Sequence, residues 1–294
     1  MSVPITLFHI SDLHFGLEDR RALDWVARAI ADEQPAAVAI TGDLTMRARH
    51  REFAAACTWI SALPVPKTVE PGNHDMPYFN LLERFVAPYR RFRAIEGLIE
   101  RPLDLGGVHI VPLQTVTRAQ WRFPWVDGWV REPALKAALR AIDALPSGTP
   151  VIVTVHHPLP ERSPDGHVLT INGDRAMAEL ARRGVLAVLS GHVHDPFDLT
   201  AETQHGPLRM IGAGTLSRRI RSTPPSFNEL TIDGRRVPPS EPADRPSAQW
   251  RRALPARPGG VAAGHPRGLP SPASFRSARR RCCGRRPRSA RRPR

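Results

Sequence analysis

Five short polar clusters, each placed directly after an apolar, β-prone run, constrain the fold of this 294-residue chain more than any other feature. In chain order they are Asp12-Leu13-His14, Gly42-Asp43, Gly72-Asn73-His74-Asp75, His156-His157-Pro158 and Gly191-His192-Val193-His194. Short apolar runs of this kind predict buried strands. The third cluster holds the most varied chemistry, because one tight turn joins an amide oxygen, an imidazole and a carboxylate.

Helical periodicity separates these predicted strands. Apolar residues recur at helical spacing in residues 19–33, 48–63, 133–145 and 174–183, and a further helix over 77–96 is broken at Pro88. Strands are expected at 3–10, 36–40, 67–70, 107–113, 151–155, 185–189, 208–211 and 227–232. Alternating strands and helices predict an α/β class with largely parallel pairing. In such sheets ligands bind beyond the carboxyl ends of the strands, where all five clusters fall.

The excess of basic residues lies almost entirely at one end of the chain. The sequence has 42 Lys and Arg against 28 Asp and Glu. Residues 235–294 contain 17 Arg, one Asp and one Glu, which leaves 25 basic and 26 acidic groups in residues 1–234. We predict one folded domain over residues 1–234. The Arg/Pro-rich, low-complexity tail over residues 235–294 buries too little apolar surface to offset its ordering entropy, so we expect it to be disordered.

Two interpretations of this tail remain open. In the first, it is a basic arm that binds nucleic acid or another polyanion. In the second, it has no selected structure, for instance because it is read in a shifted frame of a GC-rich gene. The bias toward Arg, Pro, Ala and Gly, with no Lys, favours the second interpretation. Nucleic acid is therefore expected as a partner only through the tail.

The sequence carries no recognisable targeting segment. The N-terminus enters a predicted strand almost at once, without the charged and apolar regions of a signal peptide. No apolar run approaches the ~18 residues that a membrane span needs. Three cysteines are too few for a disulfide-rich secreted scaffold. We expect a cytoplasmic protein with no membrane partner.

The clusters supply seven candidate metal ligands, namely Asp12, His14, Asp43, Asn73, His156, His192 and His194. Two carboxylates, four imidazoles and one amide oxygen suit Mn, Fe, Co, Ni or Zn better than calcium or magnesium alone. Seven ligands are too many for one ion but suit two ions if one carboxylate bridges them. Two ions roughly 3.5 to 4 Å apart can share a water, lower its pKa to about 7 and hold a phosphate for in-line attack. His157 is expected beside the ligands, in the turn with Pro158.

In this order the five blocks resemble the signature of the calcineurin-like metallophosphoesterase superfamily, and the chain looks most similar to bacterial class III cyclic-nucleotide phosphodiesterases. The resemblance covers about residues 5–233. It implies a four-layer α/β/β/α sandwich of two mixed sheets flanked by helices, with a metallophosphoesterase catalytic domain over residues 1–234. It also implies two divalent or trivalent metal ions whose identity is open.

The same resemblance implies a role for each residue. Asp12, His14 and His194 hold the first metal, Asn73, His156 and His192 hold the second, and Asp43 bridges the two. His74 binds no metal; like Asn73 it faces the substrate, where it stabilises developing charge or protonates the leaving oxygen. Asp75 is expected to fix the orientation of His74. The implied nucleophile is a metal-bridging hydroxide.

Differences from subsets of the superfamily narrow the expected activity. Protein Ser/Thr phosphatases carry a Gly-Asp-Tyr-Val-Asp-Arg-Gly block and a turn that ends in Glu. This chain instead has Gly42-Asp43-Leu44-Thr45-Met46-Arg47 and a turn that ends in Asp75. We expect a phosphodiesterase that acts on small molecules, with cyclic nucleotides as the first candidates. The alternatives are a nuclease or nucleic-acid-associated phosphoesterase, and a non-catalytic scaffold on the same fold.

Overall fold

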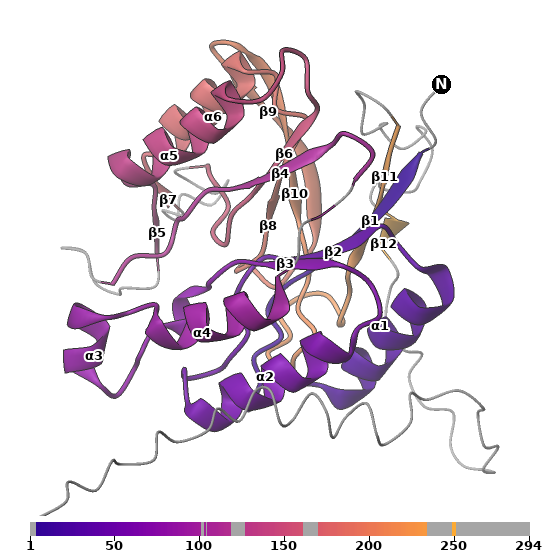
Figure 1. The fold of residues 1–294 in the computed structure, drawn as a ribbon, viewed down its shortest axis with the longest axis vertical. Helices are drawn as coiled ribbons and strands as arrows, with labels where there is room; N and C mark the ends of the chain where they lie inside the picture. Colours follow the sequence, from indigo (N-terminus) through magenta and orange to yellow (C-terminus); the bar gives the residue numbers. More distant parts are fainter. Residues whose placement is uncertain are drawn as a thin grey trace, which may run out of the picture.

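Two five-stranded sheets lie face to face at the centre of the protein, with helices on both outer faces (Figure 1). The computed structural model describes residues 4–100, 103, 105–118, 127–160, 170–233 and 249–250. The predicted α/β class and four-layer arrangement are confirmed. No helix in this described part of the chain is both long and apolar enough to cross a membrane.

The first sheet has the strand order β12-β11-β1-β2-β3. Its strands are β1 (Ile5–Ile10), β2 (Ala37–Ile40), β3 (Lys67–Val69), β11 (Asn228–Ile232) and β12 (Gln249–Trp250). Strands β1, β2 and β3 are parallel, with Leu7 opposite Ala37 and Val38 opposite Lys67, whereas β11 is antiparallel to β1. Strand β12 lies inside residues 235–294, for which the sequence predicts disorder. Its two residues nevertheless pair with β11.

The second sheet has the order β4-β6-β8-β10-β9. Its strands are β4 (His109–Pro112), β6 (Val151–Thr154), β8 (Ala187–Ser190), β9 (Phe197–Thr203) and β10 (Gly206–Gly212). Only β9 runs antiparallel to its neighbour. The sequence pattern missed β9 because this edge strand is mostly polar and half exposed. A small parallel pair, β5 (Gly128–Trp129) and β7 (Thr170–Ile171), lies apart from both sheets.

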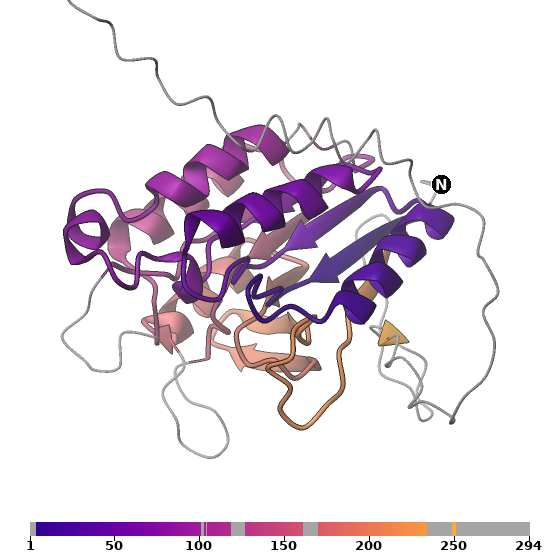
Figure 2. The same cartoon turned by 90° about the horizontal axis from the view of Figure 1, so that it is seen from below.

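Helices α1 (Arg20–Glu33), α2 (His50–Ala62) and α4 (Arg90–Ile99) cover the first sheet, and Figure 2 shows these helices on its outer face, running roughly along the strands. Helices α5 (Glu132–Asp143) and α6 (Gly173–Arg182) cover the second sheet. The short α3 (Leu81–Val86) precedes α4, and Pro88 separates the two as the sequence predicts. Helix α1 begins after Asp19, whose carboxylate accepts hydrogen bonds from the backbone of the first turn.

Side-chain alternation along the strands builds three apolar layers. In β1, Phe8 and Ile10 pack with α1 and α2, whereas Leu7 faces the second sheet and packs with residues such as Ile152 and Leu189. This period of two is the one expected for a strand buried on both faces. Because these layers are mainly apolar, most of the polar groups gather where the strands end. Those ends hold the predicted clusters.

Candidate metal centre

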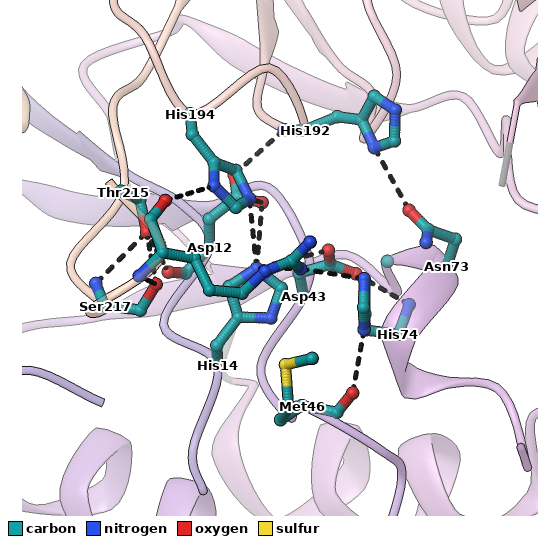
Figure 3. A network of polar contacts seen from close by, with 12 residues as sticks. Asp12, His14, Asp43, Met46, Asn73, His74, His192, His194, Thr215 and Ser217 are labelled. Carbon is teal, nitrogen blue, oxygen red and sulfur yellow. Dashed lines mark hydrogen bonds and ion pairs between the residues drawn. The ribbon is translucent and has the colours of Figure 1, made fainter. Parts of the chain in front are cut away.

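The five polar clusters converge at one edge of the two sheets. Asp12 and Asp43 follow β1 and β2, the 3-10 turn η1 (Asn73–Asp75) follows β3, and His156 and His192 follow β6 and β8. Backbone hydrogen bonds continue the pairing past the strand ends, since the Asp12 amide donates to the Gly42 carbonyl at 3.1 Å. The two sheets therefore deliver their ligands to a common point, as Figure 3 shows.

Glycines are required where these turns approach one another. A Cβ on Gly42 would lie 2.4 Å from Nδ1 of His156, and the backbone there has a φ of +99°. A Cβ on Gly72 would lie 2.0 Å from Oδ1 of Asp43. Side-chain carbons do not approach other atoms this closely, so glycine is the residue that fits at both positions.

Backbone strain is concentrated on the ligands themselves. Five of the seven candidate ligands have a positive φ, between 44° and 71°, namely Asp12, His14, Asp43, His192 and His194. A non-glycine residue in this left-handed region costs about 1 kcal/mol or more. Such strain persists only where the surrounding structure holds it, and it is typical of functional sites.

The first group of ligand atoms brings two imidazoles together with the carboxylate of Asp12. The Nε2 atoms of His14 and His194 are 3.1 Å apart. Oδ1 of Asp12 lies 3.1 Å from Nε2 of His194 and 3.6 Å from Nε2 of His14. All three side chains are buried. Their donor atoms point at one small volume.

The second group forms around the amide oxygen of Asn73, which lies 3.0 Å from Nε2 of His156 and 3.1 Å from Nδ1 of His192. Asp43 lies between the two groups. Its Oδ2 is 3.6 Å from Nε2 of His14, and its Oδ1 is 3.5 Å from Nε2 of His156. This is the arrangement expected of a carboxylate that is shared between two ions.

Backbone carbonyls orient two of the imidazoles. Nδ1 of His156 lies 2.8 Å from the Thr41 carbonyl, and Nδ1 of His194 lies 2.7 Å from the Arg219 carbonyl. A carbonyl only accepts, so each Nδ1 carries a hydrogen, and in the neutral ring each Nε2 presents a lone pair to the site. Partners of this kind fix the tautomer of metal-binding histidines.

A cation within the first group would satisfy atoms that the protein alone leaves in conflict. The Nε2 atoms of His14 and His194 face each other at 3.1 Å, and Nδ1 of His14 makes no hydrogen bond. Burial alone would raise the pKa of Asp12, but the imidazoles of His14 and His194 outweigh it and hold that pKa well below its ordinary value. A buried set of carboxylates and imidazoles fits metal ions.

Burial and neighbouring charges also shift the pKa values of His192 and His194. Burial, with the neighbouring charge of His156, lowers the pKa of His192 to about 3, so this imidazole is neutral and free to bind a metal. Burial also works against a charged His194, but the hydrogen bond and charge of Asp12 prevail and raise its pKa. The carboxylate of Asp12 thus attracts positive charge to this point.

His74 lies over the first group without joining it. Its ring is 4.8 Å from the ring of His14 in an edge-on arrangement, and its backbone amide donates to Oδ1 of Asp43 at 2.8 Å. Nδ1 of His74 donates to the Met46 carbonyl at 2.7 Å, which leaves Nε2 facing the site. Burial lowers the pKa of this imidazole, and the charge of Asp43 partly opposes the shift.

Asp75 does not hold the His74 ring, contrary to the expectation from sequence. Its carboxylate accepts hydrogen bonds from the backbone amides of Leu44, Thr45 and Gly72, and from the Thr45 hydroxyl at 2.8 Å. These contacts tie the turn after β2 to the turn after β3. Asp75 therefore positions backbone, whereas the Met46 carbonyl orients the imidazole.

His157 lies beside the second group, as expected for a residue of the turn. It is buried, its Nδ1 is 3.0 Å from the Thr115 hydroxyl, and its ring centre is 4.5 Å from that of His192. Ligand atoms of His156, His157 and His192 all lie within 4.8 Å of one another. A second such set is formed by Asp12, His14, Asp43 and His194.

Sequence reasoning missed the loop that follows β10. The Thr215 hydroxyl donates to the Asp12 carbonyl at 2.8 Å and contacts Ser217, whose hydroxyl accepts from the Arg219 amide at 3.2 Å. The Arg219 guanidinium then reaches the metal centre. No motif marks these residues, and their only sequence signal is a position just after a predicted strand.

The centre opens to solvent on one side. The candidate ligands Asp12, His14, Asp43, His156 and His194 are buried. The residues that are only partly buried are Asn73, His74, His192 and Arg219. A substrate would therefore reach the buried ligand groups past these four side chains.

Two stacked mixed sheets with a carboxylate shared between two groups of candidate ligands define a protein with a two-metal centre. A family model of the calcineurin-like phosphoesterases matches residues 5–196. The chain therefore belongs to the calcineurin-like phosphoesterase family. Membership implies a phosphoric ester hydrolase that uses two metal ions, whose identity the ligand set leaves open.

Solved structures show the same fold at low sequence identity. A dimetal phosphatase from Danio rerio is 15% identical with a TM-score of 0.57, and the match covers 78% of this chain and 92% of that one. A purple acid phosphatase from yellow lupin (Lupinus luteus) seeds is 14% identical with a TM-score of 0.57, covering 79% of this chain and 50% of that one. No curated protein sequence matches the chain. These likenesses concern the fold alone.

Proposed function

We propose that the protein is a phosphodiesterase in which Asp43 bridges two metal ions. In this assignment Asp12, His14 and His194 bind one ion, and Asn73, His156 and His192 bind the other. The observation that carries the proposal is the position of Asp43, because its two oxygens face the two groups at 3.6 Å and 3.5 Å. Removal of a shared carboxylate would disturb both sites together.

When bound, two such ions polarise the phosphoryl oxygens of a substrate and lower the pKa of a water that attacks phosphorus. The chain holds their ligands in rigid turns at strand ends, with His156 and His194 each fixed by a backbone carbonyl. Fixed ligands of this kind require little reorganisation during the reaction. We assign the positioning of the phosphate to the side chains on the open side of the centre.

His74 is the residue that we assign to the leaving oxygen. Its Nδ1 hydrogen is engaged by the Met46 carbonyl, so only Nε2 is available to a substrate. In the neutral ring Nε2 accepts, and in the protonated ring it donates a proton to the departing alkoxide. Burial lowers the pKa of His74, but the negative charge of a bound phosphate opposes that shift.

We propose diester substrates on the basis of sequence motifs. The segment from Gly42 to Arg47 departs from the pattern of the protein phosphatases, and the third turn ends in Asp75 rather than Glu. Small cytoplasmic phosphodiesters, with cyclic nucleotides first, are therefore the proposed substrates. A nuclease activity would instead require a surface for a polymer, and the basic tail is the only sequence feature that supports one.

The first experiment compares initial rates on bis(p-nitrophenyl) phosphate with added manganese for wild type, His74→Ala and Asp43→Ala. We expect His74→Ala to lower kcat by a factor of about 100 or more while it keeps its metals, because removal of a group that stabilises developing charge in the transition state typically costs this much. Asp43→Ala should lose activity together with metal content, measured by elemental analysis. Removal of the metals from wild type with a chelator should abolish activity, and manganese should restore it.

The result that contradicts the proposal is a folded wild type that binds two metals and hydrolyses neither this diester nor p-nitrophenyl phosphate. Such a protein would match the scaffold interpretation. Hydrolysis of the monoester alone would support a phosphoesterase activity but contradict the proposed preference for diesters. Cyclic nucleotides are the next substrates to test if the diester is cleaved.

A further inference from the structure

A single arginine from the loop after β10 reaches the metal centre. Nη1 of Arg219 lies 2.9 Å from Nε2 of His74 and 3.2 Å from Nε2 of His14. A guanidinium only donates hydrogen bonds, so both imidazole nitrogens accept from it at these distances; a metal bound at Nε2 of His14 would take that lone pair and leave the contact with His74. Arg219 therefore places a full positive charge beside the one imidazole nitrogen that we assign to the substrate.

The backbone of Arg219 is held independently of its side chain. Its carbonyl accepts from Nδ1 of His194 at 2.7 Å, and its amide donates to the Ser217 hydroxyl at 3.2 Å. The Ser217 hydroxyl contacts that of Thr215, which is bound to the carbonyl of Asp12. Shortening the Arg219 side chain thus leaves the carbonyl that orients His194 in place.

No acidic side chain in the described part of the chain forms an ion pair with Arg219, although the structure pairs Arg91 with Glu83 and Arg209 with Asp198. The Arg219 side chain is partly buried and lies on the open side of the centre. An arginine that points toward a metal centre, makes its contacts to neutral imidazoles and has no carboxylate partner is suited to an incoming anion. Guanidinium groups bind phosphate oxygens through charged, often bidentate hydrogen bonds.

We propose that Arg219 binds a non-bridging oxygen of the substrate phosphate beside His74, which keeps its assignment to the leaving oxygen, so that Arg219 is a substrate-binding residue of this enzyme. This inference rests on the proposed function, and it extends that function to a residue outside the five sequence blocks. When a phosphate enters, the Nη1 hydrogen turns from His74 Nε2 to the oxyanion. The same donor then binds the phosphate oxygen next to the His74 imidazole.

The charge of Arg219 also bears on substrate choice. A terminal phosphate group carries one more negative charge than a diester at neutral pH, and the attraction to a fixed cation grows with that charge. Orthophosphate and monoesters should therefore depend on Arg219 more strongly than diesters do. Loss of Arg219 should shift the ratio of diester to monoester cleavage toward the diester.

The test measures binding of inorganic phosphate by calorimetry to metal-loaded wild type, Arg219→Ala and Arg219→Lys, with metal content determined for each. The matched control is Arg218→Ala, which removes the same charge from an exposed neighbour in the same loop. We expect Arg219→Ala to weaken phosphate binding about 10- to 100-fold, which is the usual loss for a charged hydrogen bond. Arg219→Lys should restore part of this affinity, and Arg218→Ala should match wild type.

Kinetics on the two p-nitrophenyl substrates provide a second measurement. Arg219→Ala should raise KM for the monoester more than for the diester, with a smaller change in kcat than His74→Ala produces. Phosphate affinity and KM values in Arg219→Ala that equal those in Arg218→Ala would overturn the proposal. If Arg219→Ala does not fold, wild-type phosphate affinity and KM in a folded Arg219→Met variant would equally overturn it.

The two proposals fail separately. Phosphate binding needs no turnover, so a wild type that binds phosphate through Arg219 but cleaves neither ester would contradict only the proposed hydrolysis. A wild type that cleaves the diester with no contribution from Arg219 would contradict only this inference.

Discussion

At the scale of single residues, the metal centre depends on backbone geometry that most side chains do not adopt. Asp12, Asp43 and His192 all have a positive φ, and each is followed or preceded by a turn that packs against another cluster. Glycine supplies the space for these approaches. A Cβ on Gly191 would lie 1.8 Å from the Ser11 hydroxyl and 2.7 Å from Oδ2 of Asp12. The glycines of the motifs are therefore required by close packing as well as by backbone conformation.

Gly191→Ala should disturb the first ligand group. The new methyl group displaces the Ser11 hydroxyl from its hydrogen bond to the Thr41 carbonyl and pushes on the carboxylate of Asp12. We expect a loss of about 1 to 3 kcal/mol in the free energy of unfolding, as for other overpacked sites, and a lower metal content.

The control for this substitution is Gly97→Ala. Gly97 is exposed in α4 and a Cβ there meets no atom within 4 Å, so alanine should stabilise the protein by about 0.5 to 1 kcal/mol through its helix propensity. Urea unfolding and elemental analysis measure both effects. Unchanged stability and metal content in Gly191→Ala would show that the turns can move apart.

At the scale of secondary-structure elements, one buried polar contact joins the two sheets near the centre. Glu70 follows β3, and its Oε1 accepts a hydrogen bond of 2.8 Å from the Thr154 hydroxyl of β6. Burial raises the pKa of Glu70 to about 8; the Thr154 hydroxyl opposes this, and the charges of Glu100 and Glu96 add to it. The carboxyl group is thus neutral between the sheets at neutral pH.

This neutral carboxyl makes stability depend on pH in a defined direction. An unfolded Glu70 loses its proton near pH 4.5, while the folded protein keeps it until about pH 8. The folded state binds more protons in this window, so the free energy of unfolding falls as pH rises from about 4.5 to 8. The stabilisation is fully present below pH 4.5 and is lost above pH 8.

Glu70→Gln should remove this dependence, because glutamine does not titrate. Relative to wild type, the variant should gain on the order of 2 to 4 kcal/mol between pH 5 and pH 8.5. Urea unfolding at the two pH values measures the gain. Glu202→Gln, on the exposed edge strand β9, is the control. Parallel pH profiles for wild type and Glu70→Gln would contradict a raised pKa.

At the scale of the whole molecule, the centre exists only when both halves of the fold are in place. The first sheet supplies Asp12, Asp43 and Asn73, and the second supplies His156 and His192. Antiparallel β11, far along the chain, lies between β1 and β12 in the first sheet. The centre should therefore form in one cooperative transition with the sheets.

A chain that ends at residue 250 should keep the centre. It retains every candidate ligand and strand β12, and it removes most of the arginines of the tail. We expect two bound metals and a melting temperature within about 3 °C of the full chain. If the full chain binds DNA in a salt-dependent way, the shortened chain should lose that binding. Loss of metal or of cooperative melting would show that residues 251–294 support the fold.

Much of this protein could be predicted from local sequence patterns. Strand β1 and helix α1 follow from hydrophobic periodicity, and their bounds agree with the prediction to within two residues. The seven candidate ligands could be named because each lies within a short block directly after a strand. Hydrophobic periodicity and the position of a polar block after a strand both depend only on residues close together in the sequence. The half-exposed strand β9 lacked such a pattern and was not found.

The sequence by itself determined the α/β class and the identity of the side chains at the strand ends, because these depend on local periodicity and on residue chemistry; the four layers followed only from the family resemblance. Only the tertiary structure decided that Asp43 faces both groups, that Asp75 holds backbone, and that Arg219 reaches His74 across 145 positions of the chain. Contacts between residues so far apart in the sequence depend on how the two sheets pack together and on the path of the loops between strands. The Met46 carbonyl that orients His74 is a backbone group, which no side-chain pattern can reveal.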